Sequence, residues 1–282
     1  MLYFILSDIH ANLEALVSVL KDISFDPRLN QETRNKVLWG LDYAQRTEVP
    51  EVFPEPNNES CEIVSLGDIV YYGARPNECV EIVRKIADIS VLGNHEHFLL
   101  NLQGREFASS EMNRVTDWTE KQLSQENKAY LKEFYRRNRL IHKVGKIVFS
   151  HGVPTNPSLF SYNDRKGMVS WFNDGNFRDR FCFMGHSHVA YFCSLLKGRF
   201  ENQVLTNSAV PFSLKEYYSF LISVPSVGQP RDENPQAGYM IYDSRSGLVE
   251  IRRVDYDIAV TQREILAAGL PKKYALRLER GQ

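Results

Sequence analysis

Five short apolar runs, rich in Ile, Val, Leu and Phe, limit the possible fold of this chain more than any other pattern in it. Each run ends at a small or polar residue, which is typical of buried strands. The runs span residues 2–6, 62–66, 89–92, 146–149 and 181–184. Amphipathic, helix-like stretches lie between them, at residues 12–23, 76–87 and 117–137. This alternation of strands and helices predicts an α/β fold with parallel or mixed strand pairing.

The sequence changes in character after Gly185. Further apolar runs follow, separated by turn pairs such as Ser246-Gly247, at residues 190–196, 200–206, 219–224, 238–242 and 248–254. They predict antiparallel strands joined by hairpins. A closing helix is expected over residues 258–268, because Gly269 and Pro271 would end it. The basic residues that follow it are expected to be solvated.

Residues 24–60 fit this pattern poorly, because a polar stretch with four prolines separates the first helix from the second strand. An unstructured connection of this length is unusual within a compact domain. We therefore expect one helix near residues 32–45 and otherwise a surface excursion. Two roles stay open for it: a lid that shapes a substrate entrance, and decoration without function. The expected organisation is one domain over residues 1–282 with a surface insertion at residues 24–60.

Composition excludes several classes of protein. Lys and Arg (34) nearly cancel Asp and Glu (35), so the net charge of −1 gives no global attraction for nucleic acid or membranes. The sequence shows no stripe of interleaved basic and aromatic residues of the kind that would line a nucleic-acid groove. This absence argues against a nuclease. The four cysteines form no C-x-x-C pair, so neither a thiolate zinc site nor a disulfide framework is indicated. Asp8 interrupts the first apolar run too early for a signal peptide or membrane span, and a cytoplasmic location is expected.

Polar side chains stand at the ends of the five buried runs, and five of the seven histidines are among them. The segments are Asp8-Ile9-His10, Gly67-Asp68, Gly93-Asn94-His95-Glu96, Ser150-His151-Gly152 and Gly185-His186-Ser187-His188. Loops that follow adjacent parallel strands converge in space. A single buried histidine is more often a hydrogen-bonded core residue than a ligand, but chance does not account for five such ends. Oxygen and imidazole donors without thiolate predict a site for Mn, Fe or Zn.

The order D-x-H, G-D, G-N-H-[DE], H-G and G-H-x-H resembles the signature of the calcineurin-like metallophosphoesterases. Residues 6–16, 67–78 and 226–232 resemble blocks of its bacterial branch of diadenosine tetraphosphatase-like or serine/threonine phosphatase-like proteins. The resemblance covers nearly the whole chain except residues 24–60. Three positions depart from the usual pattern: Ser223-Val224-Pro225 replaces N-P-G, Glu96 replaces Asp, and Ser187 replaces Thr. We do not expect Glu96 or Ser187 to touch a metal ligand.

The resemblance implies a four-layer sandwich of two mixed β-sheets flanked by helices. It also implies a hydrolase in which a metal-activated hydroxide attacks a phosphate ester. Phosphomonoesters, phosphodiesters, dinucleoside polyphosphates and phosphoproteins all stay open as substrates, so the partner is a phosphorylated small molecule, a nucleotide or a phosphoprotein. The alternative from another functional class is a non-catalytic scaffold that keeps this fold to bind a protein partner.

Mapped position by position, the resemblance implies roles for individual residues. The ligands of one metal would be Asp8, His10, Asp68 and His188, and those of the second would be Asp68 as a bridge with Asn94, His151 and His186. His95 would stabilise the transition state or protonate the leaving oxygen. Arg231 is a candidate for binding a phosphate oxygen, with a surface ion pair as its alternative.

Three further residues near the motifs are weaker candidates for the site. Asn12 follows the first motif and is a candidate substrate contact, with helix capping as its alternative. Tyr72 and Arg75 are candidates for lining the site, although a turn before a helix is the more ordinary explanation for both.

Overall fold

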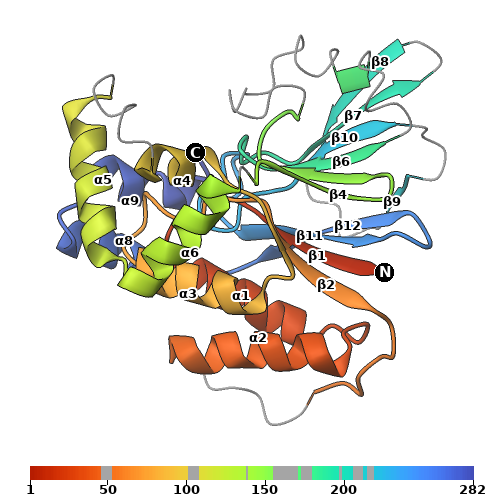
Figure 1. Cartoon of the computed structure of the whole chain (residues 1–282), viewed down its shortest axis with the longest axis horizontal. Helices are drawn as coiled ribbons and strands as arrows, with labels where there is room; N and C mark the ends of the chain where they lie inside the picture. The colour runs from red at the N-terminus through yellow and green to blue at the C-terminus, as the bar shows by residue number, and fades with distance from the viewer. Residues whose placement is uncertain are drawn as a thin grey trace.

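The computed structural model describes most of the chain. The described residues are 1–45, 53–100, 108–137, 139–154, 171–172, 180–196, 199–205, 212–214 and 219–282. Within them, two six-stranded mixed sheets face each other and helices cover the outer face of the first sheet (Figure 1). The predicted fold class, an α/β sandwich of two mixed sheets flanked by helices, is confirmed.

The first sheet has the strand order β3-β2-β1-β11-β12-β9. Its strands are β1 (Leu2–Leu6), β2 (Cys61–Ser65), β3 (Ile89–Ser90), β9 (Phe212–Ser213), β11 (Ala237–Asp243) and β12 (Leu248–Val254). The strands β1, β2 and β3 run parallel, whereas β11 is antiparallel to β1 and β12 to β11. The carboxyl ends of β1, β2 and β3 therefore lie at one edge of this sheet.

The second sheet has the order β4-β5-β6-β10-β7-β8. Its strands are β4 (Ile141–Val144), β5 (Ile147–Ser150), β6 (Phe181–Met184), β7 (Tyr191–Leu196), β8 (Arg199–Val204) and β10 (Phe220–Ser223). Here β5, β6 and β10 are parallel, and β4, β7 and β8 are antiparallel to their neighbours. The five runs of the sequence are thus divided between the sheets, three in the first and two in the second.

The core lies on both faces of the first sheet, which is why β1 reads as an unbroken apolar run. Successive side chains of a strand point to opposite faces. In β1, Tyr3 and Ile5 enter the layer between the sheets, where they join Phe149 and Phe183 of the second sheet. The alternate residues of β1 pack instead against the helices of the outer layer. On the outer face of the second sheet, Trp171 is fully buried against its strands.

Eight α-helices lie within the described ranges given above. They are α1 (Leu13–Ser24), α2 (Gln31–Ala44), α3 (Pro76–Ile86), α4 (Asn94–Leu100), α5 (Ser110–Gln122), α6 (Gln125–Arg136), α8 (Ile258–Ala267) and α9 (Lys272–Leu276). The single helix predicted over residues 117–137 is wrong. The first helix, α5, ends at its C-cap residue Leu123. The extended Ser124 then accepts a hydrogen bond from the Asn127 N–H (3.1 Å) and caps the second helix, α6. None of the described helices combines the length and the apolar content that crossing a membrane requires.

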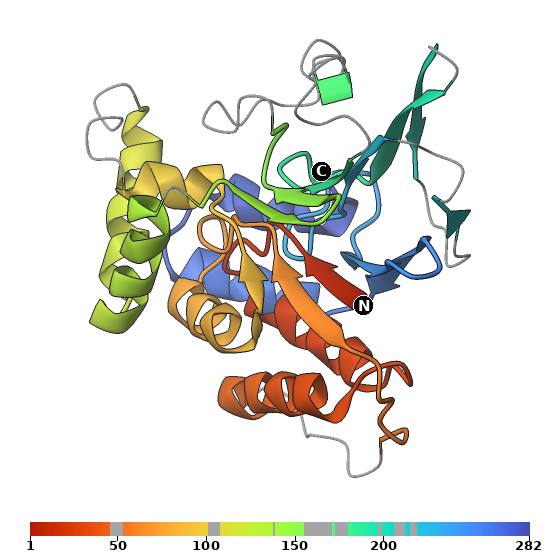
Figure 2. The same cartoon turned by 45° about the vertical axis from the view of Figure 1, so that its right-hand side comes forward.

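The helix expected near residues 32–45 is present as α2, and it packs into the core, while residues 46–52 of the expected surface excursion lie outside the described residues. Leu29, Val37 and Leu41 are fully buried in the core that α2 shares with α1 and α3. Gly40 allows this approach, because a Cβ there would lie 3.1 Å from Leu20 Cδ1. Both views place α2 on the side of α1 and α3 that faces away from the second sheet (Figures 1 and 2). This part of the segment is therefore a packed layer.

The end of the chain also differs from expectation. The prediction is a solvated basic tail after α8, and Lys272, Lys273 and Arg280 are exposed. Tyr274 and Leu278 of the same tail, however, are 4% and 2% exposed. The ring of Tyr274 packs edge-on against Tyr72, with centroids 4.9 Å apart. Buried apolar residues within a basic stretch explain the difference, because they fix the segment while its charged neighbours stay at the surface.

The packed position of α2 predicts the effect of a substitution within it. Leu41→Ala should lower the free energy of unfolding by about 2–5 kcal/mol, because it leaves a cavity in the core. Chemical denaturation of this variant and of Asp42→Ala, an exposed control on the same helix, measures the difference. If residues 24–60 acted as a lid, Leu41→Ala would instead change the KM for substrate in protein that is still folded.

Candidate metal centre

Five loops from the two sheets meet in one place. The loops after β1, β2 and β3 come from the first sheet, and those after β5 and β6 come from the second. Backbone hydrogen bonds tie them together: the Asp8 N–H donates to the Gly67 carbonyl (3.1 Å), and the Gly185 N–H donates to the His151 carbonyl (3.0 Å). The Gly228 N–H donates to the Asp8 carbonyl (3.0 Å), which adds the loop after β10. The convergence predicted from the strand ends is therefore present, with both sheets contributing.

The potential ligand atoms form three groups, and within each group they lie within 4.8 Å of one another. The groups are Asp8, His10 and His188; His10, Asp68 and His95; and Asp68, His151 and His186. Asp68 and His10 each belong to two of them. Of these two, only the carboxylate of Asp68 has two free ligand atoms with which to bridge two metal ions, because the Nδ1 of His10 bonds the Val70 carbonyl. The Asn94 Oδ1 lies 3.0 Å from the His151 Nε2, so the amide also reaches this cluster. The structure thus brings together all seven residues that the sequence predicts as metal ligands.

Backbone carbonyls orient three of the imidazole rings. The Nδ1 atoms of His10, His151 and His188 lie 3.0, 2.8 and 2.5 Å from the carbonyl oxygens of Val70, Leu66 and Gln229 respectively. A carbonyl only accepts, so Nδ1 carries the hydrogen and Nε2 is left as the ligand atom. These three Nε2 atoms lie 3.2–3.8 Å from a carboxylate oxygen of Asp8 or Asp68.

The backbone at the centre is strained. Five of the predicted ligands have φ between 49° and 67°, which is the left-handed region that side chains rarely adopt. They are Asp8, His10, Asp68, His186 and His188.

The neighbouring Gly93 and Gly185 are required for a different reason. A Cβ at these positions would lie 2.1 Å from the Asp68 Oδ1 and 1.9 Å from the Ser7 Oγ. The glycines in the motifs therefore let the loops approach each other closely.

Glu96 positions the loop that carries Asp68. Its carboxylate is 1% exposed and accepts backbone N–H bonds from Gly93, Asp68, Ile69 and Val70, at 2.7–3.1 Å. The expectation that Glu96 does not touch a metal ligand is therefore wrong, because it binds the main chain of Asp68. The longer side chain explains how one carboxylate spans two loops. Ser187, the other departure near the ligands, bonds Ser223 Oγ at 2.6 Å instead.

Burial sets the charges of the histidines. It lowers the pKa of His10 and His188 well below the usual range and that of His186 to about 3, so these rings are neutral near neutral pH. Burial also lowers the pKa of His151, but the Asp68 carboxylate beside it outweighs this and raises the pKa to about 9. Although burial disfavours its charged form, the adjacent histidines hold the pKa of Asp68 well below its usual range. Without metal, His151 and Asp68 thus form a charged pair.

His95 lies at the edge of the cluster. It is 8% exposed, and its Nε2 lies 3.8 Å from the Asp68 Oδ2. The Tyr72 ring packs edge-on against both His10 and His95, with centroids 4.6 and 4.9 Å away. Tyr72 is therefore part of the wall of the site. Arg75 is not, because its guanidinium pairs with Glu264 at 2.7 Å.

The two predicted substrate contacts differ in their surroundings. Asn12 is 2% exposed; its Oδ1 caps α1 at the Ala15 N–H (3.2 Å) and its Nδ2 donates to the Gly228 carbonyl (2.8 Å). The structure therefore shows the helix-capping contact of Asn12, and its role as a substrate contact stays a prediction. Arg231 lies beside the centre, and its charge contributes to lowering the pKa of His95 after the larger effect of burial. Its Nε is buried with no hydrogen-bond partner among the described residues.

The hydrogen bonds of Glu96 predict how its replacement affects metal binding. Glu96→Gln keeps the shape of the side chain but turns an NH₂ group toward backbone N–H donors, so the loop of Asp68 should shift. We expect metal affinity to fall about 10–100-fold, measured by titration calorimetry. Glu126→Gln, at a side chain that is 79% exposed, is the matched control. Equal affinity in Glu96→Gln and the wild type would show that the loop keeps its shape without this carboxylate.

The charged His151–Asp68 pair predicts that metal binding releases a proton. A metal ion needs the neutral Nε2 of His151, so below the pKa of about 9 the metal and a proton compete for that atom. Affinity should therefore rise with pH by about tenfold per unit and level off above this pKa. Calorimetry in buffers with different ionisation enthalpies measures the proton release. His142→Gln, outside the cluster, should release the same proton, and His151→Gln should not.

Comparison with known proteins agrees with this geometry. The calcineurin-like phosphoesterase family matches residues 1–210. The uncharacterized protein MJ0912 of Methanocaldococcus jannaschii is 32% identical over 278 residues, which cover 99% of this chain and 97% of that protein. A metallophosphoesterase from Sphaerobacter thermophilus has a TM-score of 0.73 and 31% identity over 100% of both chains. The hypothetical protein PH1004 of Pyrococcus horikoshii OT3, at 15% identity, shares the fold over 100% of this chain and 98% of its own, with a TM-score of 0.67. This chain therefore belongs to the calcineurin-like phosphoesterase family.

Proposed function

We propose that this protein hydrolyses phosphate esters at a centre of two metal ions. The observation that carries the proposal is the shared carboxylate: Asp68 is the one carboxylate that lies in two of the three groups of converging ligand atoms found among the described residues. One metal would be held by Asp8, His10, Asp68 and His188. The second would be held by Asp68 with Asn94, His151 and His186. These buried oxygen and imidazole donors fit Mn, Fe or Zn.

Two metal ions bound there supply Lewis acidity and lower the pKa of water, which is the chemistry that an in-line phosphoryl displacement requires. The chain's own residues orient the substrate. Burial lowers the pKa of His95, so its neutral ring favours donating a hydrogen bond to a phosphoryl oxygen over transferring a proton. The buried Nε of Arg231 gains an acceptor when a phosphate oxygen approaches it.

The groups that meet at the centre recognise the phosphoryl group alone. Phosphomonoesters, phosphodiesters, dinucleoside polyphosphates and phosphoproteins all carry it, so the proposed substrates are phosphorylated small molecules, nucleotides or phosphoproteins. The scaffold alternative is less favoured, because every ligand position is filled and His95 is present.

A panel of phosphatase and phosphodiesterase substrates tests the proposal. The chelated protein should be inactive toward all of them, and Mn, Fe or Zn should restore hydrolysis of at least one; Mg and Ni serve as comparisons. Asp68→Asn should lose metal and activity together. His95→Ala should keep its metal and lose about 10²–10⁴-fold in kcat. His142→Ala, outside the cluster, is the control. Bound metal without hydrolysis of any substrate would favour the scaffold.

A further inference from the structure

The buried Gln229 connects three parts of the molecule. It is 1% exposed, and its main-chain carbonyl orients the ring of His188. Its side-chain Oε1 accepts two hydrogen bonds, one from the Arg231 Nη2 (2.8 Å) and one from the Arg277 Nη1 (3.1 Å). An amide oxygen has two lone pairs, so these two guanidinium groups satisfy it completely. Arg277 belongs to the C-terminal segment, beyond the residues 1–210 that match the family.

The shared acceptor restricts how Arg231 can lie. Its Nη2 is held by Gln229, whereas its buried Nε has no partner among the described residues. The guanidinium carbon lies 5.9 Å from the centroid of the Tyr72 ring, which also contacts His10 and His95. Arg277 approaches the same oxygen from the C-terminal segment. Its hydrogen bond fixes the amide oxygen to which Arg231 also donates.

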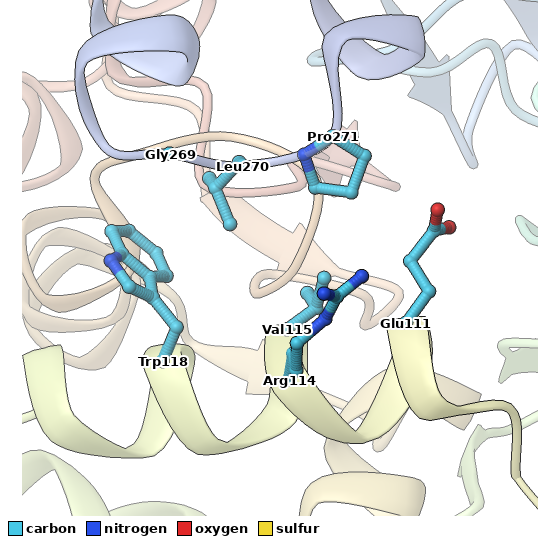
Figure 3. Close-up of a pocket in the computed structure, with 7 residues that line it drawn as sticks. All are labelled: Glu111, Arg114, Val115, Trp118, Gly269, Leu270 and Pro271. Atoms are coloured by element: carbon cyan, nitrogen blue, oxygen red, sulfur yellow. The ribbon is translucent and has the colours of Figure 1, made fainter.

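The C-terminal segment is itself firmly anchored. Arg277 Nε donates to the carbonyl of Gln282, and the Glu233 N–H donates to the Gly281 carbonyl at 2.9 Å. At the other end, the turn at residues 269–271 faces α5 across a cavity of about 360 Å³ (Figure 3). Glu111, on the rim of this cavity, pairs with Lys273 at 2.6 Å. The position of Arg277 is therefore determined by contacts at both ends of the segment.

We propose that Arg277 is a positioning residue for substrate binding, which acts by holding Gln229 and, through it, the guanidinium of Arg231 toward the phosphate. The proposal rests on the proposed function only for the identity of the substrate, because binding of inorganic phosphate reports on Arg231 whether or not any ester is hydrolysed.

Titration calorimetry of inorganic phosphate into the metal-loaded protein tests this in a double-mutant cycle. Arg277→Ala should weaken phosphate binding by about 2–10-fold, the equivalent of one lost hydrogen bond. Arg231→Ala should weaken it more. Arg277→Ala should then have no additional effect in the Arg231→Ala background, because its effect passes through Arg231. Metal content should not change, and with a hydrolysed ester KM should rise while kcat stays constant.

Two further variants separate positioning from stability. Arg277→Lys keeps the charge but not the planar fork, so it should restore part of the affinity even if Arg277→Ala folds poorly. Arg280→Ala, exposed in the same segment, should bind phosphate as the wild type does. The proposal is overturned by unchanged phosphate affinity in Arg277→Ala, or by an equal loss with and without Arg231. Absence of hydrolysis in all variants, with the cycle as expected, would refute the proposed function alone.

Discussion

The carboxylate of Asp68 is buried where the loops of both sheets meet, and its charge needs partners that a low-dielectric interior seldom provides. The Nε2 of His151 lies 3.2 Å from the Asp68 Oδ2. The main-chain N–H of His95 donates to the Asp68 Oδ1 at 2.9 Å. Glu96, a second buried carboxylate, holds the same loop through its main chain. Burial, together with the nearby Asp68, raises the pKa of Glu96 to about 7. A bound cation would relieve this concentration of negative charge.

The strained backbone of the ligands is maintained by hydrogen bonds between the same loops. Left-handed φ angles at non-glycine residues cost on the order of 1–3 kcal/mol each, so they persist only where surrounding bonds enforce them. The N–H groups of His10 and Ala11 donate to the carbonyls of Asp68 and Ile69, at 2.9 and 2.7 Å. These bonds lock the first loop to the second, and Glu96 locks the second to the third. The loops thus support one another, and metal binding would add to this support.

The metal ligands could be predicted because their spacing is local. D-x-H and H-x-H stand directly after recognisable strands, and the resemblance to a family assigns their roles. Glu96 and Gln229 stand within the recognised motifs, but they act through main-chain atoms or through another side chain, so their contacts could not be predicted from the sequence. The packing of α2 against the core could not be predicted from the sequence, because this helix has few apolar residues and is flanked by polar segments. In the C-terminal segment, the burial of Tyr274 and Leu278, four positions apart, was a helical signal hidden among basic residues.

The net charge of the chain is near zero, so the attraction of a phosphate depends on the charges of the residues at the centre. Three of the ligand histidines are neutral near neutral pH, so they add no positive charge for an anion. Asp8 and Asp68 contribute negative charge at the point where a phosphoryl group would bind. Among the described residues, His151, Arg231 and Arg277 carry positive charge near the centre, and the last two donate to the same Gln229 oxygen. In the absence of metal, His151 offsets Asp68, but a phosphate would still meet the charge of Asp8, so cations bound at this cluster would strengthen its attraction. Metal loading and phosphate binding are therefore expected to be thermodynamically coupled, with each raising the affinity for the other.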